Sequence, residues 1–196
     1  MSHFFAILSR MKLIRRWSLM YNRRSENVQE HALETAVLAY HLCVLHNTYF
    51  HGALNGEHAA VLAMYHDASE VFTGDMPTPV KYFNSRMRQT YGTVEEQARK
   101  RLLSALPAEL QAGYKPIICY PEEEPEWPFV KAADTLSAYL KCLQEVADGN
   151  REFTEAFHAL EGQLQALNMP EITLFLETYA PSFSLSLDQM HANSDG

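Results

Sequence analysis

The 196-residue chain is poor in cysteine, glycine and proline. It has 3 cysteines, 8 glycines and 9 prolines, and no two cysteines have the Cys-x-x-Cys spacing. This composition excludes a disulfide scaffold, a collagen-like repeat and a low-complexity disordered chain. Because Cys43, Cys119 and Cys142 are far apart in the sequence, a reducing compartment is the natural interpretation, and we predict a cytoplasmic protein.

Long apolar runs and strand-like alternation are also scarce. The longest uncharged apolar stretch, around residues 35–40, is far too short to cross a bilayer, so we predict no membrane association. The chain contains no internal repeat and no Gly/Ser linker, and its length suits one sizeable core. Apolar residues, 47% of the chain, instead recur with a helical period. These features predict a single all-α domain over residues 1–196.

Acidic residues are missing from the first 25 positions, which carry a formal charge of +6, whereas the remainder carries −14. A basic N-terminal segment could be a transit peptide, a nucleic-acid-binding arm or one wall of an anion site. The apolar residues Trp17, Leu19 and Met20 indicate a segment that packs on the fold. The acidic remainder disfavours nucleic-acid binding, which usually needs a broad basic face.

Periodicity and capping signals place the helices. Asn27 and Glu30 resemble a capping pair at the start of the second helix, and Gly74 has the position of a C-terminal glycine after the third. Pro77 and Pro79 predict that residues 74–79 form a loop that cannot be helical. The predicted helices cover residues 4–14, 27–46, 56–72, 93–106, 128–148, 152–167 and 171–179.

Ionisable residues interrupt the apolar faces of three of these helices. His31 lies on the apolar face of the second helix, His66, Asp67 and Glu70 crowd the end of the third, and Asp134 lies among apolar residues of a later helix. Each residue taken alone is best explained by a hydrogen-bonded polar network. Together, two imidazoles and two carboxylates can form a His₂Asp₂ set of ligands for a divalent cation.

The order His31, then His66-Asp67, then Asp134 resembles the H…HD…D pattern of the HD-domain phosphohydrolases. Further motifs resemble one family of these enzymes, the YfbR family of 5′-deoxynucleotidases. The resemblance covers roughly residues 2–188, while the connector at 121–127 and a tail at about 189–196 look less family-like. Ala32 departs from the serine that often follows the first histidine. The motifs are Arg16-Trp17, residues 26–31, 64–71, 74–81, 131–134 and 138–143.

The resemblance implies an HD fold with the active site in a cleft between helices, a homodimer, and hydrolysis of 2′-deoxyribonucleoside 5′-monophosphates. It implies that His31, His66, Asp67 and Asp134 bind the metal, three of them (His31, Asp67 and Asp134) contacting the substrate as well. Glu70 would act in general acid/base catalysis together with Arg16, which would orient the phosphate. Trp17 would line the nucleotide pocket. The residues implied to contact the sugar and exclude a 2′-hydroxyl are Asp75, Met76, Pro77 and Thr78.

Mixed nitrogen and oxygen donors suit Mn²⁺, Co²⁺, Zn²⁺ or Fe²⁺ better than Mg²⁺. Two-metal members of the HD superfamily resemble one another in having extra histidines between the HD pair and the final aspartate. No histidine lies between His66 and His158 in this chain, so we predict one metal ion per subunit, for example Co²⁺ or Mn²⁺.

Three other interpretations stay open at the level of sequence. The chain could be a different HD phosphohydrolase that acts on a nucleoside triphosphate, a cyclic nucleotide or an alarmone. It could be a nucleotide sensor that keeps the ligands without turnover, although Glu70 would then have no function. It could also be a helical interaction protein with a polar core, which would bind no metal.

Overall fold

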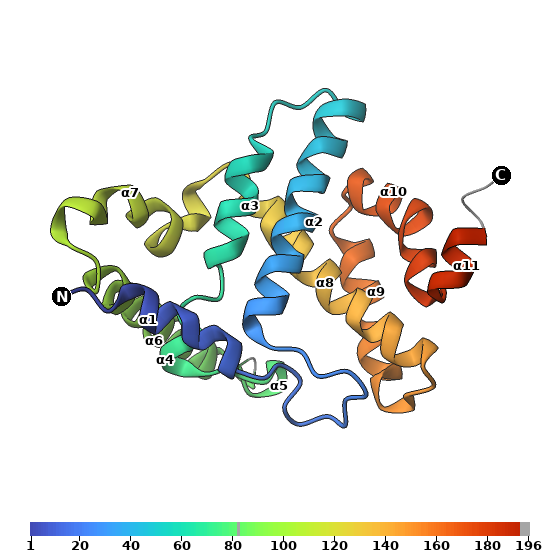
Figure 1. Ribbon diagram of the computed structural model, residues 1–196, viewed down its shortest axis with the longest axis horizontal. Coiled ribbons are helices and arrows are strands. Elements are labelled where there is room, and N and C mark those ends of the chain that lie inside the picture. The colour runs from blue at the N-terminus through green and yellow to red at the C-terminus, as the bar shows by residue number, and fades with distance from the viewer. Residues whose placement is uncertain (82, 193–196) are drawn as a thin grey trace.

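The computed structural model describes residues 1–81 and 83–192, apart from the side chains at 78, 79 and 192. These residues form helices joined by short loops, as the sequence predicts, and their one β-type pairing is an isolated bridge between Arg15 and Asn27 (Figure 1). None of the described helices is both long and apolar enough to span a membrane. The α-helices are α1 (Phe4–Leu8), α2 (Val28–Tyr49), α3 (Gly56–Tyr65), α4 (Glu70–Thr73), α5 (Thr78–Lys81), α6 (Ser85–Ser104), α7 (Ala108–Cys119), α8 (Trp127–Ala147), α9 (Thr154–Ala166), α10 (Pro170–Thr178) and α11 (Leu187–Ala192). The 3₁₀ helices are η1 (Ser9–Leu13), η2 (Pro121–Glu123), η3 (Arg151–Phe153) and η4 (Ala180–Ser184).

The two long helices α2 and α8 cross in the middle of the molecule (Figure 1). Helix α3 packs along α2, and α9 packs along α8. Helices α1, α4, α5 and α6 gather on one side of this centre, with α9, α10 and α11 on the other (Figure 1). The candidate residues on α2, on α8 and after α3 are therefore placed by the best-packed part of the fold.

Two clusters of buried apolar side chains hold these helices together. The larger joins α2, α3, α8 and α10 through residues such as Leu42, Leu62 and Leu136, all fully buried. The second joins α1 to α6 and α7 through residues such as Phe4 and Leu102. Burying one such side chain contributes about 1.5–3 kcal/mol. The second cluster also holds Val28 and Ala68, which lie close in the sequence to the candidate ligands His31 and Asp67.

The predicted cap at the start of α2 is confirmed. Asn27 Oδ1 accepts hydrogen bonds from the backbone amides of Gln29 and Glu30, each 3.0 Å long, and Glu30 Oε2 accepts one from the Asn27 amide at 3.0 Å. This reciprocal capping satisfies amides that a helix start leaves unpaired. It also fixes the register of the helix, and thereby the face on which His31 lies.

The prediction of one helix over residues 56–72 is wrong, because α3 ends at Tyr65 and α4 begins at Glu70. The His66 ring donates from Nδ1 to the Ala63 carbonyl oxygen at 2.7 Å, so this oxygen is not left for the next helical turn. Backbone bonds to the third preceding residue then form a tight turn through Asp67. Gly74 is confirmed as a C-terminal glycine, with a φ of 72°, but the helix that it ends is the short α4.

Several other boundaries also differ from prediction. The first predicted helix divides into α1 and η1. Helix α6 begins at Ser85 rather than near residue 93; the prediction missed its first turns because they are exposed and carry no apolar stripe. Helix α7 was not predicted, since Gly113 and Pro116 both oppose helix formation. Residues 74–79 are not wholly a loop. Helix α5 begins at Thr78 and has a proline at its second position, where the missing amide hydrogen costs nothing.

Candidate metal centre and phosphate site

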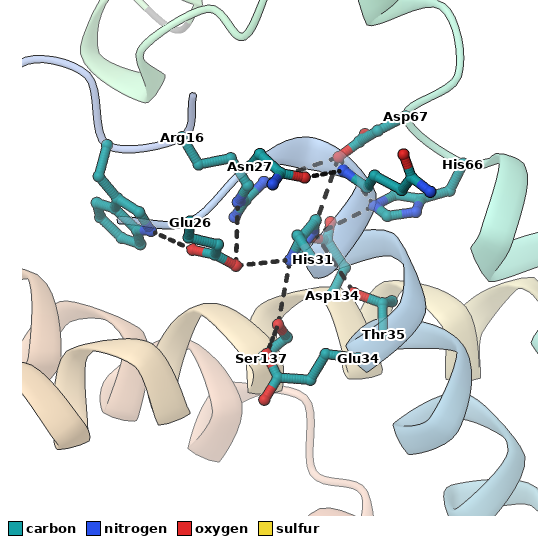
Figure 2. Close-up of polar contacts among 12 residues, drawn as sticks. Arg16, Glu26, Asn27, His31, Glu34, Thr35, His66, Asp67, Asp134 and Ser137 are labelled. Carbon is teal, nitrogen blue, oxygen red and sulfur yellow. Dashed lines mark hydrogen bonds and ion pairs between the residues drawn. The ribbon is translucent and has the colours of Figure 1, made fainter. Parts of the chain in front are cut away.

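His31, His66 and Asp134 come together although they are up to 103 residues apart (Figure 2). One ligand atom from each lies within 4.8 Å of the other two. His31 Nε2 is 3.1 Å from Asp134 Oδ1, and His66 Nε2 is 3.7 Å from the same oxygen. Spacings of this size suit three ligands around a single metal ion, whose bonds to nitrogen and oxygen are about 2.0–2.2 Å long.

Asp67 lies at the edge of this group of three. Its Oδ2 is 3.0 Å from His66 Nε2 and 3.7 Å from His31 Nε2. All four residues that the H…HD…D pattern indicates are therefore in one place, with Asp67 opposite Asp134 across the two imidazoles (Figure 2).

Only one of the two ring nitrogens of His66 has a hydrogen bond to the described backbone. Nδ1 donates to the Ala63 carbonyl, which can only accept, so Nε2 is the nitrogen that faces the carboxylates. Nε2 is buried and, although it lies 3.0 Å from Asp67 Oδ2, makes no hydrogen bond of good geometry within the described part of the chain. A cation at this point would satisfy it, and the buried donor set thus fits a metal ion.

The electrostatics of the cluster favour positive charge at its centre. Burial opposes a charged His66, but Asp67 and Asp134 outweigh it and raise the pKa of His66 to about 10. Burial would raise the pKa values of both carboxyl groups, whereas His66 beside Asp67 and Lys131 beside Asp134 hold them well below their usual range. Two ionised carboxylates in a buried site need a counter-charge, which a divalent cation supplies.

His31 is fully buried and has the opposite shift. Burial and the neighbouring Arg16 guanidinium lower the pKa of His31 to about 4, so its imidazole is neutral at pH 7. A neutral imidazole is the form that coordinates a metal ion. One of the two imidazoles is thus ready to bind, and the other would exchange a proton for the cation.

Glu70 begins α4, the short helix that follows the turn in which His66 and Asp67 lie. Its Oε2 is buried without a hydrogen-bond partner in the described residues. Burial and the nearby Asp67 and Asp75 carboxylates raise the pKa of Glu70 to about 9. A carboxyl group with such a shift beside a candidate metal centre is a common mark of acid/base chemistry.

Arg16 reaches the same cluster from the N-terminal segment. Its Nη1 is 3.7 Å from Asp67 Oδ2, and its Nε is 3.6 Å from Glu26 Oε1. The Nε atom is buried and makes no hydrogen bond within the part of the chain described here. Burial would lower the pKa of Arg16, but Glu26 and Asp67 raise it. A guanidinium with unused donors at a metal centre can bind a phosphate in a bidentate way.

Trp17 adjoins Arg16 with a strained backbone, since its φ of 55° lies in the left-handed region. Its indole Nε1 donates to Glu26 Oε2 at 3.1 Å, and its ring packs against Phe153 with the ring centres 5.4 Å apart. Asn22 donates to the Trp17 carbonyl at 3.0 Å and holds the turn. Strain of this kind often occurs where a loop must present a side chain.

Glu145 anchors this segment to α8. Its carboxylate accepts hydrogen bonds from the backbone amides of Arg23 and Arg24, at 3.1 and 3.0 Å, and pairs with Lys141. Burial opposes the charge of Glu145, but Lys141 and Asn150 together with the two amides hold its pKa at about 2. The loop that carries Arg16 is therefore tied down by a buried charge about 120 residues away in the sequence.

Of the residues implied to contact a sugar, Asp75 lies near Arg16 and the Trp17 backbone. Burial raises the pKa of Asp75 above its usual value, and the Arg16 guanidinium offsets only part of this rise. Met76 and Pro77 are half-buried. The side chain of Thr78 lies outside the described residues.

A cavity of about 230 Å³ lies beside the cluster. Glu26, which contacts His31, and Glu34 are both in its wall. A larger hollow of about 560 Å³ lies at the start of α6, and none of the described site residues predicted from the sequence lies in the wall of either space. The cavity beside the cluster is lined by Arg24, Ser25, Glu26, Glu30, Glu34, Lys141 and Gln144.

A second group with metal-ligand chemistry, His58, Glu124 and Glu126, lies away from this site. Its members already have partners: His58 Nε2 lies 3.0 Å from Glu124 Oε2, and Glu126 accepts from the Asn55 amide at 2.9 Å. An ion pair beside a helix start accounts for this group without a metal.

Comparison with known proteins decides which HD proteins this chain belongs with. A family model described as 5′-deoxynucleotidase YfbR-like matches residues 3–183. The chain is 52% identical to the 5′-deoxynucleotidase YfbR of Escherichia coli O1:K1 over 196 residues, 98% of each chain. It belongs to the YfbR-like 5′-deoxynucleotidase family. A 5′-deoxynucleotidase of Pectobacterium atrosepticum is also 52% identical, over 195 residues and 98% of both chains.

Solved structures agree on the fold of this YfbR-like protein. An HD-domain phosphohydrolase from Listeria innocua superposes with a TM-score of 0.81, at 24% identity over 92% of this chain and 88% of that one. The cyanophage S-2L HD phosphohydrolase DatZ, solved with dA and one catalytic Zn²⁺ ion, has a TM-score of 0.65, at 20% identity over 90% of this chain and 96% of that one. The prediction of an all-α HD fold is confirmed.

Three polar residues in this site were not identified from the sequence: Glu26, Glu34 and Ser137. Glu26 links Arg16, Trp17 and His31, while Glu34 and Ser137 follow the candidate ligands His31 and Asp134 by three residues on their helices. That three-residue spacing was the available signal, because it places a side chain beside the preceding ligand.

Proposed function

We propose that this YfbR-like protein hydrolyses 2′-deoxyribonucleoside 5′-monophosphates to deoxynucleosides and phosphate, with the help of one divalent metal ion per subunit. The observation that carries the proposal is the grouping of the fully buried His31 with the half-buried His66 and Asp134 beside Asp67, with Arg16 and Glu70 at its edge. The three buried cysteines are free thiols, which supports a location in the reducing cytoplasm.

His31, His66, Asp67 and Asp134 would hold the metal ion, and their mixed nitrogen and oxygen donors suit Co²⁺ or Mn²⁺. When bound, a divalent cation lowers the pKa of water towards neutrality and offsets the charge that develops on the phosphoryl group. The four side chains would also bring the substrate phosphate into a fixed place.

Arg16 would bind two phosphate oxygens through its guanidinium, which Asp67 and Glu26 keep in position. The Glu70 carboxyl would move a proton, either from the attacking water or to the leaving 5′-oxygen. Burial of Glu70 and Arg16 excludes bulk water from both contacts and strengthens them.

The nucleoside would lie between two segments, the one between η1 and α2 that carries Trp17 and the one between α4 and α5 that carries Asp75. Trp17 would line the pocket, and stacking on an aromatic ring accepts any base, so base preference would be weak. Asp75, Met76, Pro77 and Thr78 would contact the sugar and leave no room or partner for a 2′-hydroxyl. The two prolines at 77 and 79 stiffen this wall.

We also propose a homodimer formed through α2. Four large apolar side chains on this helix, spaced by three or four residues, are exposed. A second copy of the same stripe would cover them, as isologous dimers do. The residues are Leu33, Val37, Tyr40 and Val44.

The test of the function is a substrate panel with elemental analysis. The reconstituted protein should contain one tightly bound metal ion per chain and release phosphate from dAMP, but none from dATP, a cyclic nucleotide or a guanosine tetraphosphate. Turnover of one of the other substrates in place of dAMP would identify a different HD phosphohydrolase. Binding of dAMP without turnover would identify a sensor.

A further inference from the structure

A short polar chain leads from His31 to α8 and back to α2, on the side away from the other ligands (Figure 2). The Ser137 hydroxyl donates to Glu34 Oε2 at 2.8 Å. The Ser137 Oγ atom lies 3.1 Å from His31 Nδ1. His31 and Ser137 are fully buried, whereas Glu34 is half-buried.

The directions of these two hydrogen bonds depend on each other. A serine hydroxyl has one hydrogen, and Glu34 receives it in the shorter contact, so the Ser137 oxygen presents its lone pairs to His31. His31 Nδ1 must then carry the hydrogen of that bond. His31 Nε2 lies 3.1 Å from Asp134 Oδ1, which can only accept, so a cation that takes the place of this contact would meet the lone pair of the neutral ring on Nε2.

Other groups near His31 do not replace Ser137. Glu26 Oε1 is 3.6 Å from Nδ1, beyond hydrogen-bond length, and Thr35 Oγ1 is 3.5 Å from the other ring nitrogen, Nε2. Because both His31 and Ser137 are fully buried, bulk water has no easy access to Nδ1.

We propose that Ser137, oriented by Glu34, is a positioning residue that holds His31 as a metal ligand with Nε2 towards the ion. The assignment rests on the metal site of the proposed function. Partners of this kind fix the tautomer and orientation of a ligand histidine, and their loss typically costs about 10–100-fold in metal affinity.

The test is metal affinity, measured by competition with a chromogenic chelator for Co²⁺ and Zn²⁺. Ser137→Ala should raise the metal Kd about 10–100-fold, and Glu34→Gln should raise it less. The double variant should bind no more weakly than Ser137→Ala, because Glu34 acts only through Ser137. Thr135→Ala, which removes a hydroxyl from the same helix without a contact to His31, should leave the Kd unchanged.

The melting temperature of each metal-free variant separates positioning from folding. Ser137→Cys keeps the side-chain size but replaces the hydroxyl by a weak acceptor, so it should lose metal affinity even if Ser137→Ala unfolds. Unchanged metal affinity in both serine variants would overturn the inference, as would additive losses in the double variant. If the wild-type protein itself bound no metal, the proposed metal site would fail together with this assignment.

Discussion

His31 and Asp134 project from long helices at the centre of the fold, whereas Arg16 and Trp17 lie on an irregular segment between η1 and α2. The helical side chains are positioned by packing, since Leu42, Leu62 and Leu136 fill the core between α2, α3 and α8. The loop side chains are positioned by polar anchors.

Those anchors are few and specific. Glu26 holds Arg16 and Trp17, and Glu145 holds the backbone of Arg23 and Arg24. The comparison indicates that the candidate metal centre is preformed by the core, whereas the proposed phosphate contact depends on single buried charges. Changes in the two regions should therefore have different signatures, in metal affinity for one and in KM for the other.

The largest effect should come from Glu70, which lies between the two regions. Glu70→Gln keeps the shape but removes the transferable proton, so kcat for dAMP should fall by about 10²–10⁴-fold while the metal Kd stays constant. The measurement is steady-state phosphate release beside metal titration. Glu57→Gln, an exposed change on the preceding helix, is the control. A kcat within a few-fold of wild type would remove Glu70 from the mechanism.

A smaller effect should follow from Arg16→Lys, which keeps the charge but loses the planar donor fork. We expect kcat/KM for dAMP to fall by about 10–100-fold, the size of one charge-assisted hydrogen bond, while the metal Kd changes little. Arg15→Lys, at the exposed neighbouring position, should behave as wild type. Loss of metal binding in Arg16→Lys would mean that the two regions are not separable.

The smallest effect on activity should come from the loop anchor. The pKa of Glu145, about 2, lies below its ordinary value, so its ion pair stabilises the fold above about pH 4.5 and the contribution disappears as the pH falls towards 2. Glu145→Gln should cost about 1–3 kcal/mol of stability at pH 7 and less at pH 3.

Urea unfolding of wild type and Glu145→Gln at both pH values measures this difference, with the exposed Glu177→Gln as control. The KM for dAMP should also rise a few-fold, because the anchored loop carries Arg16. A stability difference that grows as the pH falls would contradict the account.

The sequence was most informative where structure is local. The capping pair at Asn27 and Glu30 depends on residues three apart, and Gly74 ends its helix through its own backbone freedom. The grouping of His31, His66 and Asp134 was predicted for the same reason, since ionisable residues stand out on apolar helical faces.

What failed depended on contacts that periodicity does not contain. Helix α3 ends at Tyr65 because the His66 ring bonds the Ala63 carbonyl, and the sequence pattern continues through that point. Glu145 holds a loop about 120 residues away, and Ser137 contacts His31 across 106 residues. Such pairs become visible only when the packing of α8 against α2 and against the loop before α2 is known.

The most direct test combines both regions in one assay. The protein is stripped with a chelator, Co²⁺ or Mn²⁺ is added back, and phosphate release from dAMP and AMP is measured in parallel. The account predicts no release without metal, and metal-dependent release from dAMP that greatly exceeds that from AMP. Equal rates with the two substrates would contradict the role given to residues 75–78, and release that persists without metal would contradict the metal centre itself.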